Sequence, residues 1–83
     1  MNEIIRRRLR VRGIVQGVGF RPFVFGLANR LKLAGHVGND PAGVFIELQG
    51  SPPAVERFLA LLVAHPPAQA RITAVEVENL PPV

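Results

Sequence analysis

The sequence predicts an α+β domain in which a four-stranded antiparallel sheet carries two helices on one face. In three segments of the 83-residue chain, apolar residues alternate with polar ones, which is the period of a strand with one buried face. In two further segments they recur every three or four residues, as on the buried side of a helix. With one additional short strand, the elements follow in the order strand, helix, strand, strand, helix, strand.

The first strand and the first helix are joined by a glycine-rich turn. Residues 8–13 predict the strand, because apolar residues alternate there with arginines. Pro22 suits the first turn of a helix, and apolar spacing predicts that this helix covers residues 21–33. Its expected apolar positions are Phe20, Val24, Leu27, Ala28 and Leu31. Gly35 is expected to end the helix, and Gly26 within it predicts a close contact with a neighbouring element.

The middle of the chain predicts two strands joined by a tight turn. Residues 36–39 form the short strand, and residues 40–43, Asp-Pro-Ala-Gly, have the composition of a turn. Val44, Ile46 and Leu48 alternate with Phe45, Glu47 and Gln49, so a second one-faced strand is expected there.

The last third predicts a helix and a strand. Ser51 can cap the helix and two prolines suit its first turn, whereas His65 and the prolines after it stop the helix. Its expected apolar stripe is Val55, Phe58, Leu59, Leu62 and Val63. Residues 73–78 alternate again and predict the final strand. This order of elements is the split βαβ arrangement of ferredoxin-like folds, in which one face of the sheet stays uncovered.

The composition excludes several classes of protein. Cysteine is absent, so disulfides, thiol nucleophiles and thiolate metal ligands are excluded in these residues. No apolar run reaches the roughly 18 residues that a membrane-spanning helix needs. The first residues lack the apolar core of a signal peptide, and we therefore expect a cytoplasmic protein.

The basic residues are concentrated near the start of the chain. The formal net charge is +4, and half of the ten basic residues lie within residues 6–12. Such a cluster can attract nucleic acid, but the chain has no Trp or Tyr on which bases would stack. In the ferredoxin-like arrangement the first strand lies between the third and the fourth, so we expect ion pairs across these strands. The arginines are Arg8, Arg10 and Arg12, and the acids are Glu47, Glu76 and Glu78.

The glycine-rich turn has the features of an anion-binding loop. Gly17 and Gly19 permit positive φ, and a loop of alternating handedness points successive backbone N–H groups inward. The following helix adds its N-terminal amides, and Arg21 adds a planar charged group that matches phosphate oxygens. The glycine spacing is neither G-x-G-x-x-G nor a P-loop. The alternative is a tight connection from strand to helix with a solvated Arg21.

The motifs GIVQGVGFR, at residues 13–21, and GHVGND, at residues 35–40, resemble those of the acylphosphatase family. The resemblance covers essentially the whole chain and implies hydrolysis of an acyl phosphate on a ferredoxin-like fold. It implies that the phosphate is bound by Gln16, Gly17, Val18, Gly19, Phe20 and Arg21. It also implies that Arg21 and Asn39 are catalytic, with Asn39 positioning the attacking water.

Within that family, the stretches FRPFV, NDPAGVFIELQG and PPAQARI resemble the N-terminal domain of the HypF carbamoyltransferases, which mature [NiFe]-hydrogenases. This resemblance implies that carbamoyl phosphate is bound and hydrolysed to phosphate and carbamate. It implies no cofactor and no metal in this domain, with zinc and ATP in other parts of the parent protein. The expected partners are those other domains and, through them, a hydrogenase-maturation protein. The final Pro-Pro-Val is typical of a linker, so residues 1–83 are expected to be one domain of a larger protein.

An acyl phosphate can be cleaved without the usual hydrolase side chains. Because phosphate is a good leaving group, the reaction needs no general acid. The protein has only to hold the phosphate and to orient a water. His36 and His65 are accordingly expected to be structural or surface residues, and Asp40 a turn residue. Three alternatives stay open: a stand-alone acylphosphatase with broad substrates, a non-catalytic module that binds anions or RNA, and a docking domain that has lost turnover.

Overall fold

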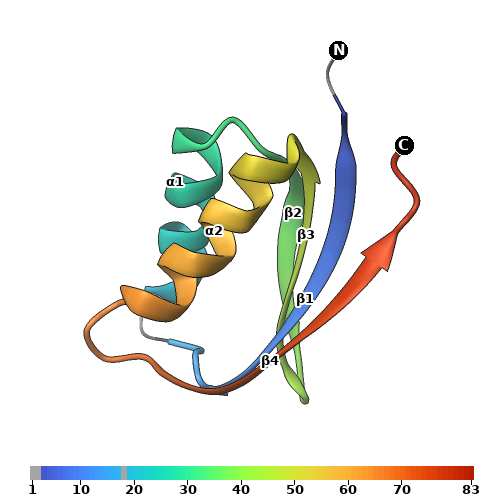
Figure 1. Ribbon diagram of the computed structural model, residues 1–83. Coiled ribbons are helices and arrows are strands. Elements are labelled where there is room, and N and C mark those ends of the chain that lie inside the picture. Colours follow the sequence, from blue (N-terminus) through green and yellow to red (C-terminus); the bar gives the residue numbers. More distant parts are fainter. Residues whose placement is uncertain (1–2, 18) are drawn as a thin grey trace.

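The computed structural model describes residues 3–17 and 19–83 and contains four strands and two helices (Figure 1). The elements are β1 (Ile5–Ile14), α1 (Phe20–Arg30), β2 (Ala34–Asp40), β3 (Gly43–Gly50), α2 (Pro52–Ala64) and β4 (Arg71–Leu80). Both helices lie on the same side of the sheet (Figure 1). The predicted order and architecture are therefore confirmed.

The sheet has the strand order β2-β3-β1-β4, and every neighbouring pair is antiparallel. The strand β1 lies between β3 and β4, as predicted, and β2 is an edge strand. Leu9 is paired with Ile46 on β3 and with Val77 on β4. Because directly paired residues share a face, this register places the alternating apolar residues on the side of the helices.

The core lies between the helices and the sheet, and its buried strand residues come from β1 and β3. Its buried side chains are Leu9, Val11, Val15, Phe20, Val24, Leu27, Leu33, Val44, Ile46, Leu48, Val55, Phe58 and Leu62. The predicted alternation on β3 and most of the stripe on α2 are thus confirmed. The prediction for Val63 is wrong, because its side chain is 57 % exposed. Successive helical residues are rotated by about 100°, so the residue after the buried Leu62 points away from the sheet.

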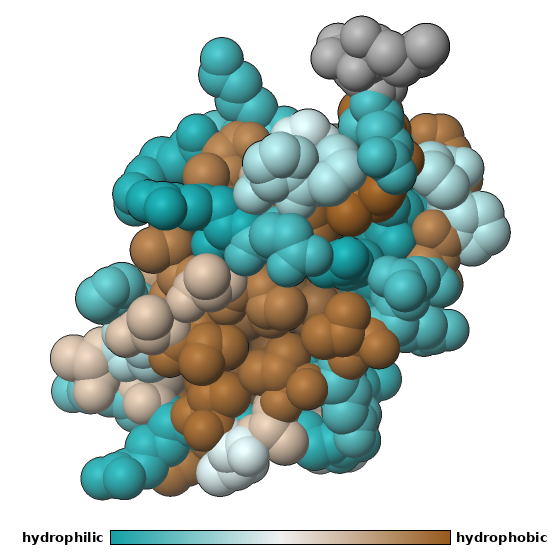
Figure 2. All heavy atoms as spheres, viewed as in Figure 1, coloured by the Kyte–Doolittle hydropathy of each residue, from teal (hydrophilic) through white to brown (hydrophobic). Residues whose placement is uncertain are grey.

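Apolar side chains also lie on the surface between α2 and β4 (Figure 2). Val63 on α2 is exposed, and Val77 on β4 is 47 % exposed. The strand β4 is at the edge of the sheet and α2 packs against β1 and β3. The final strand therefore keeps part of its apolar face in solvent, although its sequence alternates like that of a half-buried strand.

The first helix ends earlier than predicted. It stops at Arg30, and the chain turns at Lys32, which has a φ of 59°. Gly35 lies inside β2, where an added Cβ would overlap the backbone carbonyl of Glu47. The glycine therefore serves the close approach of two strands and does not cap the helix. The contact predicted at Gly26 is also absent, because an added Cβ there meets no atom of the described residues within 4 Å.

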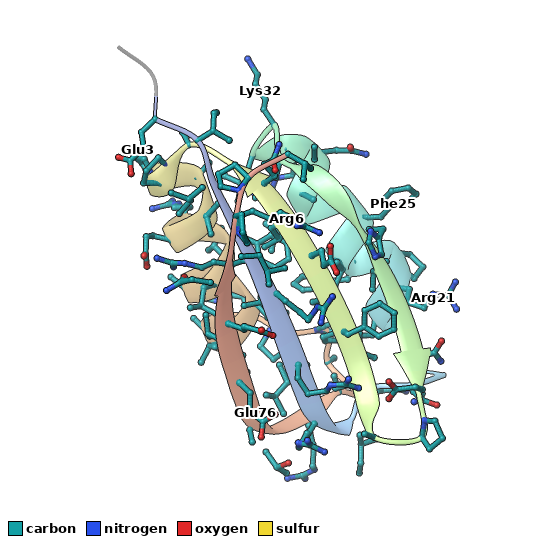
Figure 3. The ribbon with its side chains drawn as sticks, turned by 90° about the vertical axis from the view of Figure 1, so that its right-hand side faces the viewer. Glu3, Arg6, Arg21, Phe25, Lys32 and Glu76 are labelled. Carbon is teal, nitrogen blue, oxygen red and sulfur yellow. The ribbon has the colours of Figure 1, made fainter. Side chains whose placement is uncertain are left out.

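The even-numbered arginines of β1, Arg6, Arg8, Arg10 and Arg12, form ion pairs on the face that the helices leave open (Figure 3). Arg8 pairs with Glu47 at 2.7 Å and Arg12 pairs with Glu76 at 3.3 Å, as the sequence predicts. Arg6 is a second partner of Glu47, at 2.6 Å. Hydrogen bonds hold the pKa of the Glu47 carboxyl below its ordinary value; the bond from Arg8 has the larger effect and the bond from Arg6 the smaller. Within residues 3–17 and 19–83, Glu78 has no ion pair, so the predicted ladder is confirmed in part.

None of the helices in the described part of the chain has the length and the apolar character needed to cross a membrane.

Candidate phosphate-binding site

One cavity of about 770 Å³ brings together the predicted site residues. The loop after β1 and the start of α1 line it with Gln16, Gly17, Gly19, Phe20, Arg21 and Pro22. The edge strand β2 lines it with Asn39, among other residues. Two segments about 20 residues apart in sequence therefore border the same space. Val18, which was also predicted to bind phosphate, lies outside the described residues.

The loop has the backbone conformation that its glycines predict. Gly17 has a φ of 73° and Gly19 a φ of 75°, both in the left-handed region that glycine adopts without steric cost. Gly19 is the residue that precedes the first turn of α1, and it has no side chain with which to cap the helix. Phe20 is 2 % exposed and anchors the loop in the core. The amides of the first turn thus begin beside the cavity, where the positive end of the helix dipole favours an anion.

Asn39 lies on the helix side of the sheet. It is paired with Val44, which is fully buried under the helices. Because paired residues share a face, the Asn39 side chain points to the side on which α1 begins. Asn39 is exposed, so its carboxamide is accessible from the cavity.

Arg21 differs from the arginines of β1. It is exposed at the start of α1 and extends outward beside β2 (Figure 3). Within the described part of the chain it has no ion pair, whereas Arg6, Arg7, Arg8, Arg10 and Arg12 each pair with a carboxylate. Its guanidinium is therefore available to an anion in the cavity.

The end of β2 is tied to its surroundings through Asp40. The backbone N–H of Ala42 donates to Asp40 Oδ1 at 2.9 Å, which gives Asp40 the turn role that the sequence predicts. Arg10 Nη1 donates to both carboxylate oxygens of Asp40, at 2.6 and 2.7 Å. Gln16 Nε2 donates to the Asp40 carbonyl at 3.3 Å, and this bond joins the loop to β2. The Arg10–Asp40 pair was not predicted from the sequence, because the two residues lie on strands that are not neighbours.

The two histidines lie apart. His36 is on β2, where its Nε2 is 4.0 Å from Glu47 Oε2 and its ring meets Phe45 edge-on, with 6.1 Å between centroids. His65 is the residue that follows the last turn of α2. In residues 3–17 and 19–83, no three His, Cys, Asp or Glu side chains are grouped so that they could hold a metal ion. The arrangement offers backbone amides, a guanidinium and a carboxamide, which suit an anion.

The chain is similar to known proteins along nearly its whole length. The family model for acylphosphatase matches residues 7–83. The chain belongs to the acylphosphatase family. An acylphosphatase of Burkholderia mallei is 51 % identical over 72 residues, which cover 86 % of this chain and 72 % of that protein. The crystal structure of an acylphosphatase from Bacillus subtilis superposes with a TM-score of 0.87 at 35 % identity, and covers 95 % of this chain and 88 % of the other.

This acylphosphatase domain is also similar to part of the HypF carbamoyltransferases. HypF2 of Cupriavidus necator is 53 % identical over 75 residues, which cover 90 % of this chain and 9 % of HypF2. A crystal structure of full-length HypF in a phosphate- and nucleotide-bound form superposes with a TM-score of 0.94 at 38 % identity, covering 96 % of this chain and 11 % of HypF. The chain thus spans about a tenth of the length of these relatives. The resemblance to both groups that the sequence indicates is confirmed.

Proposed function

We propose that this domain binds the phosphate group of an acyl phosphate in the cavity beside Arg21, and that carbamoyl phosphate is its substrate. Water would cleave the mixed anhydride to phosphate and carbamate. One observation carries the proposal: the glycine loop and Arg21 on one side, and Asn39 on the other, line a single cavity. Similarity to a HypF crystallised in a phosphate- and nucleotide-bound form supports the same class of ligand.

The proposed mechanism depends on charge stabilisation and orientation. The amides of residues 16–21 and the Arg21 guanidinium hold the phosphoryl oxygens and stabilise the negative charge that develops there. The Asn39 carboxamide both donates and accepts hydrogen bonds, so it can orient a water toward the mixed anhydride. The phosphate group of the substrate takes the proton of that water. The step needs no nucleophilic side chain.

The similarity to HypF supports carbamoyl phosphate as the substrate. In a HypF-type protein the carbamate formed here would pass to the other domains. Zinc, ATP and the hydrogenase-maturation partner would be bound by those domains. A cytoplasmic location also stays a prediction. The second candidate is a stand-alone acylphosphatase with broad substrates, which the 51 % identity to the Burkholderia mallei protein favours. RNA binding is disfavoured, because the arginines of β1 are engaged by carboxylates.

The test is phosphate release from carbamoyl phosphate and acetyl phosphate, measured side by side. Arg21→Ala should lower kcat by about 10²–10³-fold, comparable to the loss of one oxyanion donor. Arg57→Ala is the matched control, because Arg57 is an exposed helical arginine on α2, away from the cavity. Near-normal turnover by Arg21→Ala would refute the assignment. Turnover of acetyl phosphate with none of carbamoyl phosphate would favour the second candidate.

A further inference from the structure

The last two residues of β2 point to opposite faces of the sheet. Asn39 faces the cavity on the helix side, whereas Asp40 pairs with Arg10 on the open face. Side chains of consecutive strand residues alternate between the two faces in this way. A contact that fixes the side chain of Asp40 therefore also restricts the backbone that carries Asn39. Because β2 is an edge strand, only β3 supports it in the sheet.

Arg10 reaches this strand end from the interior of the sheet. It lies on β1, and β3 separates it from β2. Neighbouring strands are about 4.8 Å apart, so the Arg10 and Asp40 side chains together bridge two such intervals. Its guanidinium carbon lies 5.8 Å from the centroid of the Phe45 ring on β3, before the group meets both Asp40 oxygens. The arginine is thus supported by the strand that it crosses.

Two further contacts limit movement of the same strand end. Gly38 leaves room for the Phe45 ring, because an added Cβ would lie 2.7 Å from its Cζ. The ring can therefore lie close to β2, beneath the guanidinium. Gln16 in the loop donates to the Asp40 carbonyl at 3.3 Å, so the strand end is linked to the loop as well.

The hydrogen bond from Arg10 and the backbone N–H of Ala42 favour the ionised carboxyl and lower the pKa of Asp40, while burial opposes them.

We infer that the Arg10–Asp40 ion pair is a positioning element for Asn39, acting from the face of the sheet opposite the cavity. The inference rests on the proposed function of Asn39 in orienting water. Neither Arg10 nor Asp40 lines the cavity, so neither is placed to touch the substrate. Removing the pair should therefore change how well the water is oriented and leave the affinity for phosphate unchanged.

The test compares Arg10→Gln and Asp40→Asn with a control on the same strand, Arg7→Gln. Asp40→Asn keeps an oxygen that can accept from the Ala42 N–H, so it removes the ion pair and retains the turn. Arg7 forms an ion pair of similar length, 2.7 Å to Glu56 on α2, away from β2. Phosphate release from carbamoyl phosphate gives kcat and KM, and inhibition by inorganic phosphate reports binding. The melting temperature of each variant reports its stability.

Arg10→Gln and Asp40→Asn should each lower kcat by about tenfold, with the inhibition constant for phosphate changed less than about twofold. The double variant should lose no more than either single variant, because both remove the same interaction. Arg7→Gln should lower the melting temperature and leave kcat unchanged. A parallel decline of kcat and melting temperature in all three variants would overturn the inference, because it would reflect stability alone.

A second measurement separates this inference from the proposed function. The NMR order parameters of the Asn39 backbone and side-chain amides should fall in Arg10→Gln and stay unchanged in Arg7→Gln. Unchanged values in Arg10→Gln would overturn the inference, whatever the activity. If the wild-type domain releases no phosphate from either substrate, the proposed function fails, and the order parameters still decide whether the ion pair holds Asn39.

Discussion

Replacing Gly19 by alanine isolates the energetic cost of the left-handed loop. Gly19 has φ and ψ angles of 75° and 19°, and an added Cβ meets no described atom within 4 Å. The destabilisation should therefore come from the backbone conformation alone, at about 1–2 kcal/mol. Gly35→Ala is the contrasting variant. At that position φ is 144° and the added Cβ would overlap the backbone of Glu47, so the strands β2 and β3 must separate.

The two variants should differ clearly in thermal unfolding. For a domain of this size, 1 kcal/mol shifts the melting temperature by about 4–8 °C, so Gly19→Ala should melt about 4–16 °C below the wild type. Gly35→Ala should lose more or fail to fold. Gly19→Asn should lose less than Gly19→Ala, because asparagine tolerates the left-handed region.

Calorimetry of the purified variants is the assay, with urea unfolding as a second measure of the free energy. Equal destabilisation by alanine at positions 19 and 35 would refute the reasoning, since it would mean that the space around the new Cβ has no influence. A Gly19→Ala variant as stable as the wild type would refute it too, because the left-handed conformation would then carry no cost.

Three other predictions concern the water site, the pH dependence of stability and the core. Asn39→Ala should slow hydrolysis of carbamoyl phosphate and keep the inhibition constant for phosphate; loss of both would mean that Asn39 binds the anion. The pKa of Glu47 is lowered in the fold, so its ion pairs stabilise the protein above the ordinary pKa of 4.5, and this contribution disappears as the pH falls through the folded pKa. The difference in melting temperature between the wild type and Glu47→Gln should therefore be larger at pH 7 than at pH 3, and a constant difference would contradict this. Phe58→Ala should reduce the free energy of unfolding by about 3–5 kcal/mol, because Phe58 is fully buried. A loss below about 1 kcal/mol in urea titrations would contradict this, because it would show that neighbouring core side chains fill the space left by the ring.

The local pattern of the chain was enough to predict most of the fold. Alternation on residues 44–49 predicts that Val44, Ile46 and Leu48 face the helices, because successive residues of a strand point to opposite faces. Glu47 is also buried, on the other face, where Arg6 and Arg8 pair with it. Ser51 predicts the start of α2, and the structure places its Oγ 3.4 Å from the Ala54 N–H. The first helix was predicted too long, because its apolar period continues to Leu31 while the turn at Lys32 depends on how the chain enters β2.

The candidate site was predicted from a motif, and its geometry depends on contacts between distant residues. The glycines of the loop have the positive φ that their spacing predicts, since that preference belongs to the residue itself. The partner of Asp40 was missed, because an arginine 30 residues away becomes a neighbour only when the strands adopt the order β2-β3-β1-β4. Arg21 and Asn39 likewise line one cavity only because the folded chain brings β2 beside the start of α1. Periodicity and turn preference are properties of short segments, whereas ion pairs between distant strands and the walls of a cavity depend on how the whole chain packs.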